Sequence, residues 1–256
     1  MAASFRDTVR GLPRVVLAAA TALVVVLAAV AGRVVLARAG DRASRASVTS
    51  AQAAPTVRAV HIPRMVTLPV VDGHLDEALW RDLAARSGPF VDPSGMDARP
   101  YSEARFGWSE EGGGALYVAL FAADIDVQAH GTAEDAVAPQ DDAFRIAFPQ
   151  GATTHLLEGS VLGTLGDAEI SRGRVDPSWS SGARLAADTD GTPNDSTDDD
   201  EEWTLEWRIP LAPLGHGALA GEHIAMTVRR CDSPRRGPRV CASFGDAVPV
   251  DLVLDP

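Results

Sequence analysis

The densest set of side chains able to bind a metal ion is an acidic run, residues 188–202, with the sequence DTDGTPNDSTDDDEE. Ca²⁺ takes about six to eight oxygen ligands from carboxylate, amide and carbonyl groups, which this run could supply. The run lacks the spacing of an EF-hand, because that loop needs a third acid before its glycine and a later glutamate. A solvated loop that keeps a sheet edge soluble is the favoured alternative. The predicted calcium ligands are Asp188, Asp190, Asp195 and Asp198.

Charged side chains gather in two further places. Four carboxylates would form a second, weaker oxygen cluster if the strands that carry them are neighbours: Asp124, Asp126, Asp141 and Asp142. Five arginines surround the two cysteines: Arg229, Arg230, Arg235, Arg236 and Arg239. They could bind an anionic glycan or the acidic surface of a partner. The favoured interpretation is that they balance the acidic charge of their own domain.

Sugar binding needs exposed aromatic side chains, because the apolar face of a sugar ring stacks on them while its hydroxyl groups find polar partners. Trp80, Trp203 and Trp207 lie in apolar-periodic stretches and are predicted to be core residues. Trp179 lies in a loop rich in proline, serine and glycine, and Trp108 ends a predicted strand. These two are the candidate ligand-binding tryptophans, although Trp179 could equally fold back onto the domain.

Sequence signatures of catalysis are missing. The chain contains no G-x-S-x-G, no H-E-x-x-H, no phosphate-binding loop and no G-x-G-x-x-G after a strand. Its six histidines are scattered without the spacing of metal ligands, and neither cysteine has an adjacent activating base. The sequence therefore predicts a protein that is not an enzyme.

The stretch VDGHLDEALW, residues 71–80, combines three carboxylates with a tryptophan. Leucines at helical spacing, continuing to Leu83, predict a short helix with Asp76 as its N-cap. Adjacent helical residues point about 100° apart, so Asp76 and Glu77 cannot flank one scissile bond. We therefore predict that this stretch is structural and that Trp80 inserts into the sandwich.

From about Val66 onward, short apolar runs are separated by glycine, proline and aspartate. In WTLEWRI the apolar residues Trp203, Leu205 and Trp207 alternate with polar ones, which is typical of a strand. Many short strands with turns between them predict an all-β fold, a two-sheet antiparallel β-sandwich of immunoglobulin-like or jelly-roll-like form. The predicted strands are 104–108, 116–122, 143–148, 154–157, 183–187, 203–209, 223–229 and 250–254.

Residues 1–39 are predicted to be a membrane anchor or signal segment, residues 40–65 a flexible linker and residues 66–256 the folded domain. The uncharged run from Val15 to Gly32 is long enough to cross a bilayer as a helix. It is also longer than the usual core of a signal peptide, so an uncleaved single-pass anchor is favoured. Cleavage near Ala39, after a small-x-small site, is the alternative.

Cys231 and Cys241, the only cysteines, enclose a turn with proline and glycine, which predicts a disulfide in an oxidising compartment. Two reduced, buried thiols are the alternative. We expect a protein of the cell envelope with its domain outside the cytoplasm, or a secreted or periplasmic one if cleaved. Residues 1–50 carry +5, which leaves −17 for residues 51–256 once it is taken from the total of −12. So acidic a domain is not expected to bind nucleic acid.

Four stretches, VDGHLDEALW, ALYVALFAADIDV, DDAFRIAF and EEWTLEWRIPLAPLG, occur in this order. As an ordered set they resemble the family 9 carbohydrate-binding modules and their relatives among bacterial envelope proteins. The resemblance covers roughly residues 66–256. It implies a β-sandwich, non-catalytic sugar binding and often bound calcium, and any link with glycoside hydrolysis rests on it alone.

The resemblance does not extend to the sugar clamp of that family, which is a pair of tryptophans. One precedes the acidic pair that opens the middle strand, where this chain has Ala138-Pro139-Gln140. The other lies in a late loop, where this chain offers only Phe244. Asp142 of the acidic pair, and Arg145 where the family usually has an acid, join Trp179 and Trp108 as the candidate ligand-binding residues.

Three functions follow from these patterns. The leading expectation is that a membrane-tethered or exported domain binds a cell-surface or extracellular glycan. The alternative is a structural or protein-interaction module of the cell envelope that has lost sugar binding, as the missing clamp suggests. A minor alternative is a haem-binding subunit, for which the lysine-free chain could offer only Met96 or Met226 with a histidine.

Overall fold

The computed structural model describes residues 57–131, 137–195, 197–245 and 248–256, which belong to one compact unit, Pro55–Pro256. The predicted N-terminal segment, residues 1–39, and residues 40–56 of the predicted linker lie outside this description. Within the described ranges, no helix has both the length and the apolar character needed to cross a membrane.

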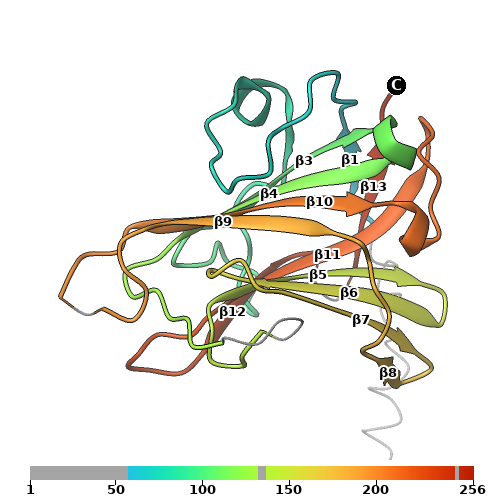
Figure 1. Cartoon of the computed structure of the whole chain (residues 1–256). Coiled ribbons are helices and arrows are strands. Elements are labelled where there is room, and N and C mark those ends of the chain that lie inside the picture. The colour runs from blue at the N-terminus through green and yellow to red at the C-terminus, as the bar shows by residue number, and fades with distance from the viewer. Residues whose placement is uncertain (1–56, 132–136, 196, 246–247) are drawn as a thin grey trace, which may run out of the picture. The chain divides into compact units, whose positions relative to one another are not determined.

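Two β-sheets face each other and form the predicted β-sandwich (Figure 1). The five-stranded sheet has the order β2 (Ala85–Arg86), β3 (Ser102–Ser109), β4 (Ala115–Ala123), β10 (Glu202–Pro210) and β9 (Arg184–Asp190). The eight-stranded sheet has the order β1 (Ala59–Ile62), β13 (Val250–Leu254), β11 (His223–Asp232), β5 (Ala143–Gln150), β6 (Thr153–Ser160), β7 (Leu165–Ser171) and β8 (Arg174–Asp176), and β12 (Val240–Phe244) also pairs with β11. Neighbouring strands are antiparallel, except that β1 runs parallel to β13. The helical turns are η1 (Leu79–Leu83), η2 (Glu111–Gly113) and η3 (Ala212–Leu214).

Each predicted strand is present, at β3, β4, β5, β6, β9, β10, β11 and β13. The prediction misses β1, β2, β7, β8 and β12. Every side chain of β7 is half-buried and every one of β8 is exposed, so neither strand has the alternation that marks a half-buried strand. Because β1 lies within the predicted linker, the folded domain begins before Val66.

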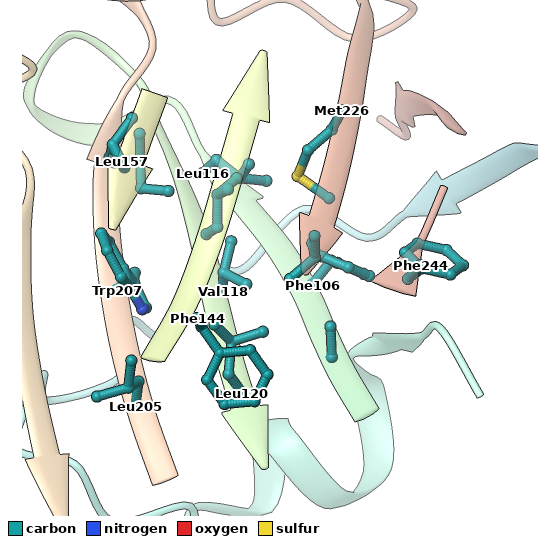
Figure 2. Close-up of a cluster of buried hydrophobic side chains, with 14 of the residues drawn as sticks. Phe106, Leu116, Val118, Leu120, Phe144, Leu157, Leu205, Trp207, Met226 and Phe244 are labelled. Carbon is teal, nitrogen blue, oxygen red and sulfur yellow. The ribbon is translucent and has the colours of Figure 1, made fainter. Parts of the chain in front are cut away.

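The main core lies between the two sheets. Trp203, Leu205 and Trp207 of β10 are fully buried there, as predicted. Figure 2 shows Leu205 and Trp207 in this core together with Phe144 and other apolar side chains. The Phe144 and Trp203 ring centroids are 4.9 Å apart, which joins the eight-stranded sheet to the five-stranded one. Gly159 of β6 makes room for Trp207, because a Cβ at that position would lie 2.4 Å from the indole.

A second, smaller core covers the outer face of the five-stranded sheet. Met65, Leu79 and Trp80 contact Tyr117 and two alanines of β4. Trp80 is fully buried in this outer core and does not lie between the sheets. The prediction that Trp80 inserts into the sandwich is therefore wrong. The physical reason is that the polar face of β10, which carries Glu206, is not open to solvent but is covered by the segment that contains Trp80.

The predicted helix is reduced to a single turn. η1 follows Ala78, no side chain caps it, and Leu83 at its end is 69% exposed. The prediction that Asp76 is the N-cap is therefore wrong. The segment is held in place by its contacts with the sheet, and an amphipathic helix is not required.

Glu206 of β10 anchors the stretch at residues 71–80 to the sheet. Its Oε2 accepts hydrogen bonds from the backbone N–H groups of Asp72 and Gly73, each at 3.0 Å. Its Oε1 accepts one from the indole Nε1 of Trp80 at 2.6 Å. Gly73 has a φ of 95°, and a Cβ there would lie 2.5 Å from the carbonyl carbon of Ala187. The stretch is therefore structural, as predicted.

Candidate functional site

Three loops meet at one end of the sandwich, where β4, β9 and β11 end. The backbone N–H of Val127, after β4, donates to Asp200 Oδ2 at 2.7 Å. The Asn194 side chain, after β9, accepts from the backbone N–H of Ala129 at 3.0 Å and donates to its carbonyl oxygen at 2.5 Å. These bonds tie the loop after β4 to the loop after β9.

Asp142 ties the loop after β4 to the loop after β11. It is fully buried, and its Oδ2 accepts from the backbone N–H of Gln128 at 2.7 Å. Its Oδ1 accepts from the backbone N–H of Ser233 at 2.6 Å. Asp142 was predicted to contact a ligand, but the structure gives it no exposed surface. Its carboxylate instead positions the two loops.

A cleft of about 510 Å³ opens between these loops. Among the described residues that line it, the imidazole of His130 is the only aromatic ring. A ligand in this cleft would therefore be held by hydrogen bonds and charge, without the stacking that a tryptophan provides. The polar side chains that line it are Gln128, His130, Gln140, Asn194, Ser233, Arg235 and Arg239.

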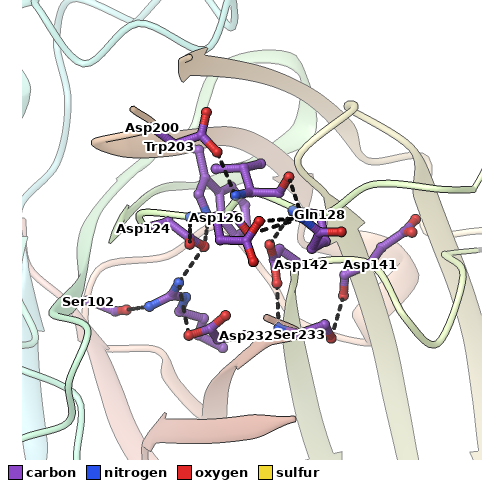
Figure 3. A network of polar contacts seen from close by, with 12 residues as sticks. Ser102, Asp124, Asp126, Gln128, Asp141, Asp142, Asp200, Trp203, Asp232 and Ser233 are labelled. Atoms are coloured by element: carbon purple, nitrogen blue, oxygen red, sulfur yellow. Dashed lines mark hydrogen bonds and ion pairs between the residues drawn. The ribbon is translucent and has the colours of Figure 1, made fainter. Parts of the chain in front are cut away.

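A buried cluster of three carboxylates and one arginine lies beside these loops (Figure 3). Asp124, Asp142 and Asp232 each place an oxygen within 4.8 Å of the other two. Arg230 Nη2 donates to Asp124 Oδ2 at 2.7 Å and lies 3.9 Å from Asp232 Oδ2. Burial, reinforced by the charge of Asp124, raises the pKa of Asp142 to about 7, and burial also raises the pKa of Asp232. Arg230 contributes a positive charge, and the raised pKa values favour the neutral forms of Asp142 and Asp232. The net charge of the cluster is therefore small.

This cluster does not fit the calcium ion that the family resemblance implies. Both oxygens of Asp142 already accept backbone N–H groups. Asp124 Oδ2 accepts from Arg230 and, at 3.3 Å, from the indole Nε1 of Trp203. Ca²⁺ needs several oxygens that can turn toward it, whereas here Arg230 already places a positive charge among them.

The predicted calcium ligands lie elsewhere. Asp188 and Asp190 are exposed on β9, and Asp195 and Asp198 are exposed in the loop that follows. Asp195 Oδ1 accepts from the backbone N–H and the hydroxyl of Thr197. Within the part of the chain that the structure describes, the four carboxylates do not belong to a group close enough to share an ion. Calcium binding by this run stays a prediction.

The remaining predicted ligand-binding residues do not line the cleft. Trp108 is fully buried and its Nε1 donates to the Asp255 carbonyl oxygen at 2.8 Å, so it has no surface for a ligand. Trp179 is half-buried and stacks on His155, with ring centroids 4.7 Å apart. His155 is near the start of β6, at the end of the sheet away from the cleft. Arg145 is exposed on the outer face of the eight-stranded sheet.

Arg230 and Asp232 both belong to the buried cluster. The sequence patterns single out Arg230 only as one of the arginines around the cysteines, and they do not single out Asp232. The signal for them is the alternation along β11. Ile224, Met226 and Val228 are fully buried, and Arg230 and Asp232 continue the same inward-facing series. A charged residue at an inward position of a strand indicates a buried partner.

The haem alternative gains no support from the structure. Met226 is fully buried in the core between the sheets, where Figure 2 shows it among apolar side chains. Met96 is 67% exposed in a loop.

Comparisons with known proteins identify the fold. No family model and no curated protein matches the sequence. A solved structure of a candidate carbohydrate-binding protein from Bacteroides uniformis has a TM-score of 0.62 at 14% identity, covering 78% of this chain and 100% of that one. A family 9 carbohydrate-binding module from Caldicellulosiruptor kristjanssonii gives TM-scores of 0.51 with cellotriose bound and 0.53 with glucose bound. Both of its structures are 12% identical to this chain and cover 77% of it, and the match spans 94% and 96% of the module.

The described domain therefore has the fold of the family 9 carbohydrate-binding modules. This confirms the resemblance and the fold class that the sequence predicts.

Proposed function

We propose that this domain binds a carbohydrate, without catalysing a reaction, in the cleft between the loops after β4, β9 and β11. The fold that it shares with sugar-binding modules carries the proposal. The cleft supports it, because its amide, imidazole and guanidinium groups can donate to and accept from sugar hydroxyls. Asp142 and Asn194 hold the loops in place, so the cleft is largely formed before a ligand arrives.

We also propose that the domain lies outside the cytoplasm and is tethered to the membrane by the N-terminal segment. The disulfide between Cys231 and Cys241 joins directly opposite residues of β11 and β12. Such bonds persist in oxidising compartments, which supports export. A cell-surface or extracellular glycan would then be the ligand within reach.

Calorimetric titration with a panel of neutral and acidic oligosaccharides, with and without Ca²⁺, tests the proposal. We expect one class to bind, and we expect His130→Ala and Gln140→Ala to weaken that binding at least about tenfold, since each removes a polar group from the cleft. Trp179→Ala is the matched control at the other end of the sheet and should change little. Phe121 lines a second hollow, of about 450 Å³, on the outer face of the five-stranded sheet. Phe121→Ala should leave saccharide affinity unchanged if the ligand binds in the cleft, and a loss of affinity would place the ligand in this hollow. The absence of binding to every saccharide would overturn the proposal.

A second candidate function is a protein-interaction module of the cell envelope. The observation that favours it is the lack of an aromatic platform in the described lining of the cleft. Cross-linking in intact cells, followed by mass spectrometry of the purified chain, would reveal a stoichiometric protein partner. That result, together with flat titrations for all saccharides, would favour this function over sugar binding.

A further inference from the structure

Two arginines face each other on the outer surface of the eight-stranded sheet. Arg145 of β5 and Arg229 of β11 are directly opposite in the antiparallel register, and both are exposed. Like charges at directly opposite positions destabilise a sheet. The fold on its own gains nothing from this pair, whereas a bound anion would bring the two guanidinium groups a shared partner.

Arg239 brings a third guanidinium to the same place. It lies in the loop between β11 and β12, and with Arg145 and Arg229 it lines a hollow of about 240 Å³. The disulfide between Cys231 and Cys241 belongs to this lining and fixes the two ends of the loop. Arg239 also lines the 510 Å³ cleft, so the hollow and the cleft meet at this side chain.

The described lining of the hollow has an excess of positive charge. Glu158 is its one carboxylate and pairs with Arg145, with Nη2 2.9 Å from Oε1. Arg239 donates to the backbone carbonyl oxygens of Pro139 and Asp141, which orient its guanidinium without neutralising it. Three arginines against one glutamate give this lining a net charge of +2, in a chain whose total is −12.

The chemistry and the size of the hollow indicate what it could hold. Guanidinium groups bind carboxylate and sulfate through paired N–H donors. A hollow of about 240 Å³ is smaller than the roughly 300–1,000 Å³ of a site that encloses a whole ligand. It would therefore take one anionic group, and the rest of the ligand would lie in the adjoining cleft.

We propose that this hollow binds the carboxylate or sulfate group of an acidic saccharide whose sugar rings occupy the cleft. The inference rests on the proposed function and narrows its ligand from carbohydrates in general to anionic ones. Arg229 and Arg239 bind the anionic group, and Arg145 contributes in competition with its ion pair to Glu158. Because the interaction is electrostatic and near the surface, salt weakens it.

The test is a titration of the purified full-length chain with a neutral, a uronate and a sulfated oligosaccharide at low and high salt. We expect an acidic oligosaccharide to bind at least about tenfold more tightly than the neutral one at low salt, and the two acidic arms show which group is preferred. Arg229→Met should abolish that preference. Arg184→Met, which removes an exposed arginine of β9, is the matched control and should preserve it. Glu158→Gln should tighten acidic binding, because it releases Arg145.

Inorganic sulfate separates the arginine site from the sugar cleft. We expect sulfate to raise the melting temperature of the wild-type chain and of Arg184→Met, and to do so less in Arg229→Met. Arg229→Met should melt no lower than wild type without sulfate, since it removes a like-charge pair. Equal affinity for neutral and acidic saccharides, unchanged in Arg229→Met, would overturn this inference and leave the proposed function standing. Absence of all saccharide binding would overturn the proposed function, and a sulfate effect unchanged in Arg229→Met would overturn the arginine site.

Discussion

Buried polar residues join segments of this domain that are far apart in sequence. Arg230 of β11 bonds to Asp124 after β4 and, at 3.3 Å, to Ser102 of β3. Glu206 of β10 holds the segment that contains Trp80. Each group is desolvated and depends on its partner, so the loss of one member should cost more than the pair contributes as a whole.

Arg230→Met is expected to lower the free energy of unfolding by about 3–5 kcal/mol, because it leaves buried carboxylates without their cation. Urea unfolding at pH 7.5 measures this change. The double variant Arg230→Met/Asp124→Asn should recover part of the loss, since it also removes one of the uncompensated charges. Arg229→Met, the exposed neighbour, is the control. Equal stability of the two single variants would contradict the role assigned to Arg230.

Glu206 should make the domain more stable in mildly acidic solution. Burial raises its pKa to about 7, from 4.5 for an ordinary glutamate. Between pH 4.5 and pH 7, Glu206 is protonated in the folded state and ionised in the unfolded state. Its contribution to stability is therefore full below pH 4.5 and is lost as the pH rises through 7. Between pH 5.5 and 8 the loss amounts to about 2 kcal/mol for this group.

Glu206→Gln cannot titrate, so its free energy of unfolding should change less between pH 5.5 and pH 8 than that of the wild type. Urea unfolding at the two pH values provides the comparison. Glu111→Gln, at an exposed position in η2, is the control and should keep the wild-type pH dependence. An undiminished pH dependence in Glu206→Gln would show that this carboxyl does not titrate in that range. Asp142, whose pKa is also raised to about 7, would then account for the effect.

Among the elements, sequence periodicity predicts the strands that have one buried apolar face and one polar face. It fails for strands such as β7 and β8, whose two faces are equally exposed. β10 is predicted because its apolar residues alternate, and its inward side chains are fully buried. The same pattern could not show that residues 63–84 cover the other face, since that depends on a contact between Glu206 and a loop more than 100 residues earlier. For the same reason the candidate site was only partly predicted. The sequence marks the acidic pair at Asp142, but its partners, the backbone N–H groups of Gln128 and Ser233, lie in two loops about 100 residues apart in sequence.

The segment before η1 should be intolerant of any side chain at Gly73. A Cβ there would approach the backbone of Ala187 to 2.5 Å, in addition to the strain of a φ of 95°. Gly88 is the matched control, because it also has a positive φ of 73° but has nothing within 4 Å of its Cβ position. We expect Gly88→Ala to cost about 1 kcal/mol of unfolding free energy and Gly73→Ala clearly more. Urea unfolding followed by tryptophan fluorescence measures both, and equal costs would show that the loop shifts freely.

At the scale of the whole molecule, the acidic charge and the arginine-lined hollow have opposite effects on an anionic ligand. The −17 carried by residues 51–256 repels polyanions in general. We expect an acidic saccharide to bind in the hollow beside the disulfide loop, where three arginines face one glutamate. Such a domain would hold an anionic glycan at one orientation relative to the chain, and a tether at the N-terminus would keep the complex near the membrane.

The tether can be tested on the protein purified from its native membrane fraction under non-reducing conditions. We expect the intact mass to include residues 1–39, because the apolar run from Val15 to Gly32 is long enough to span the bilayer. The mass should also be about 2 Da below that of the reduced chain, since the Cys231–Cys241 bond removes two hydrogens. A mass that matches a chain starting after Ala39 would identify a cleaved signal and a released domain. β11 and β12 place Cys231 directly opposite Cys241, so the two sulfurs should be joined wherever the surroundings are oxidising. Two free thiols in the exported protein would therefore contradict both the disulfide and the oxidising location.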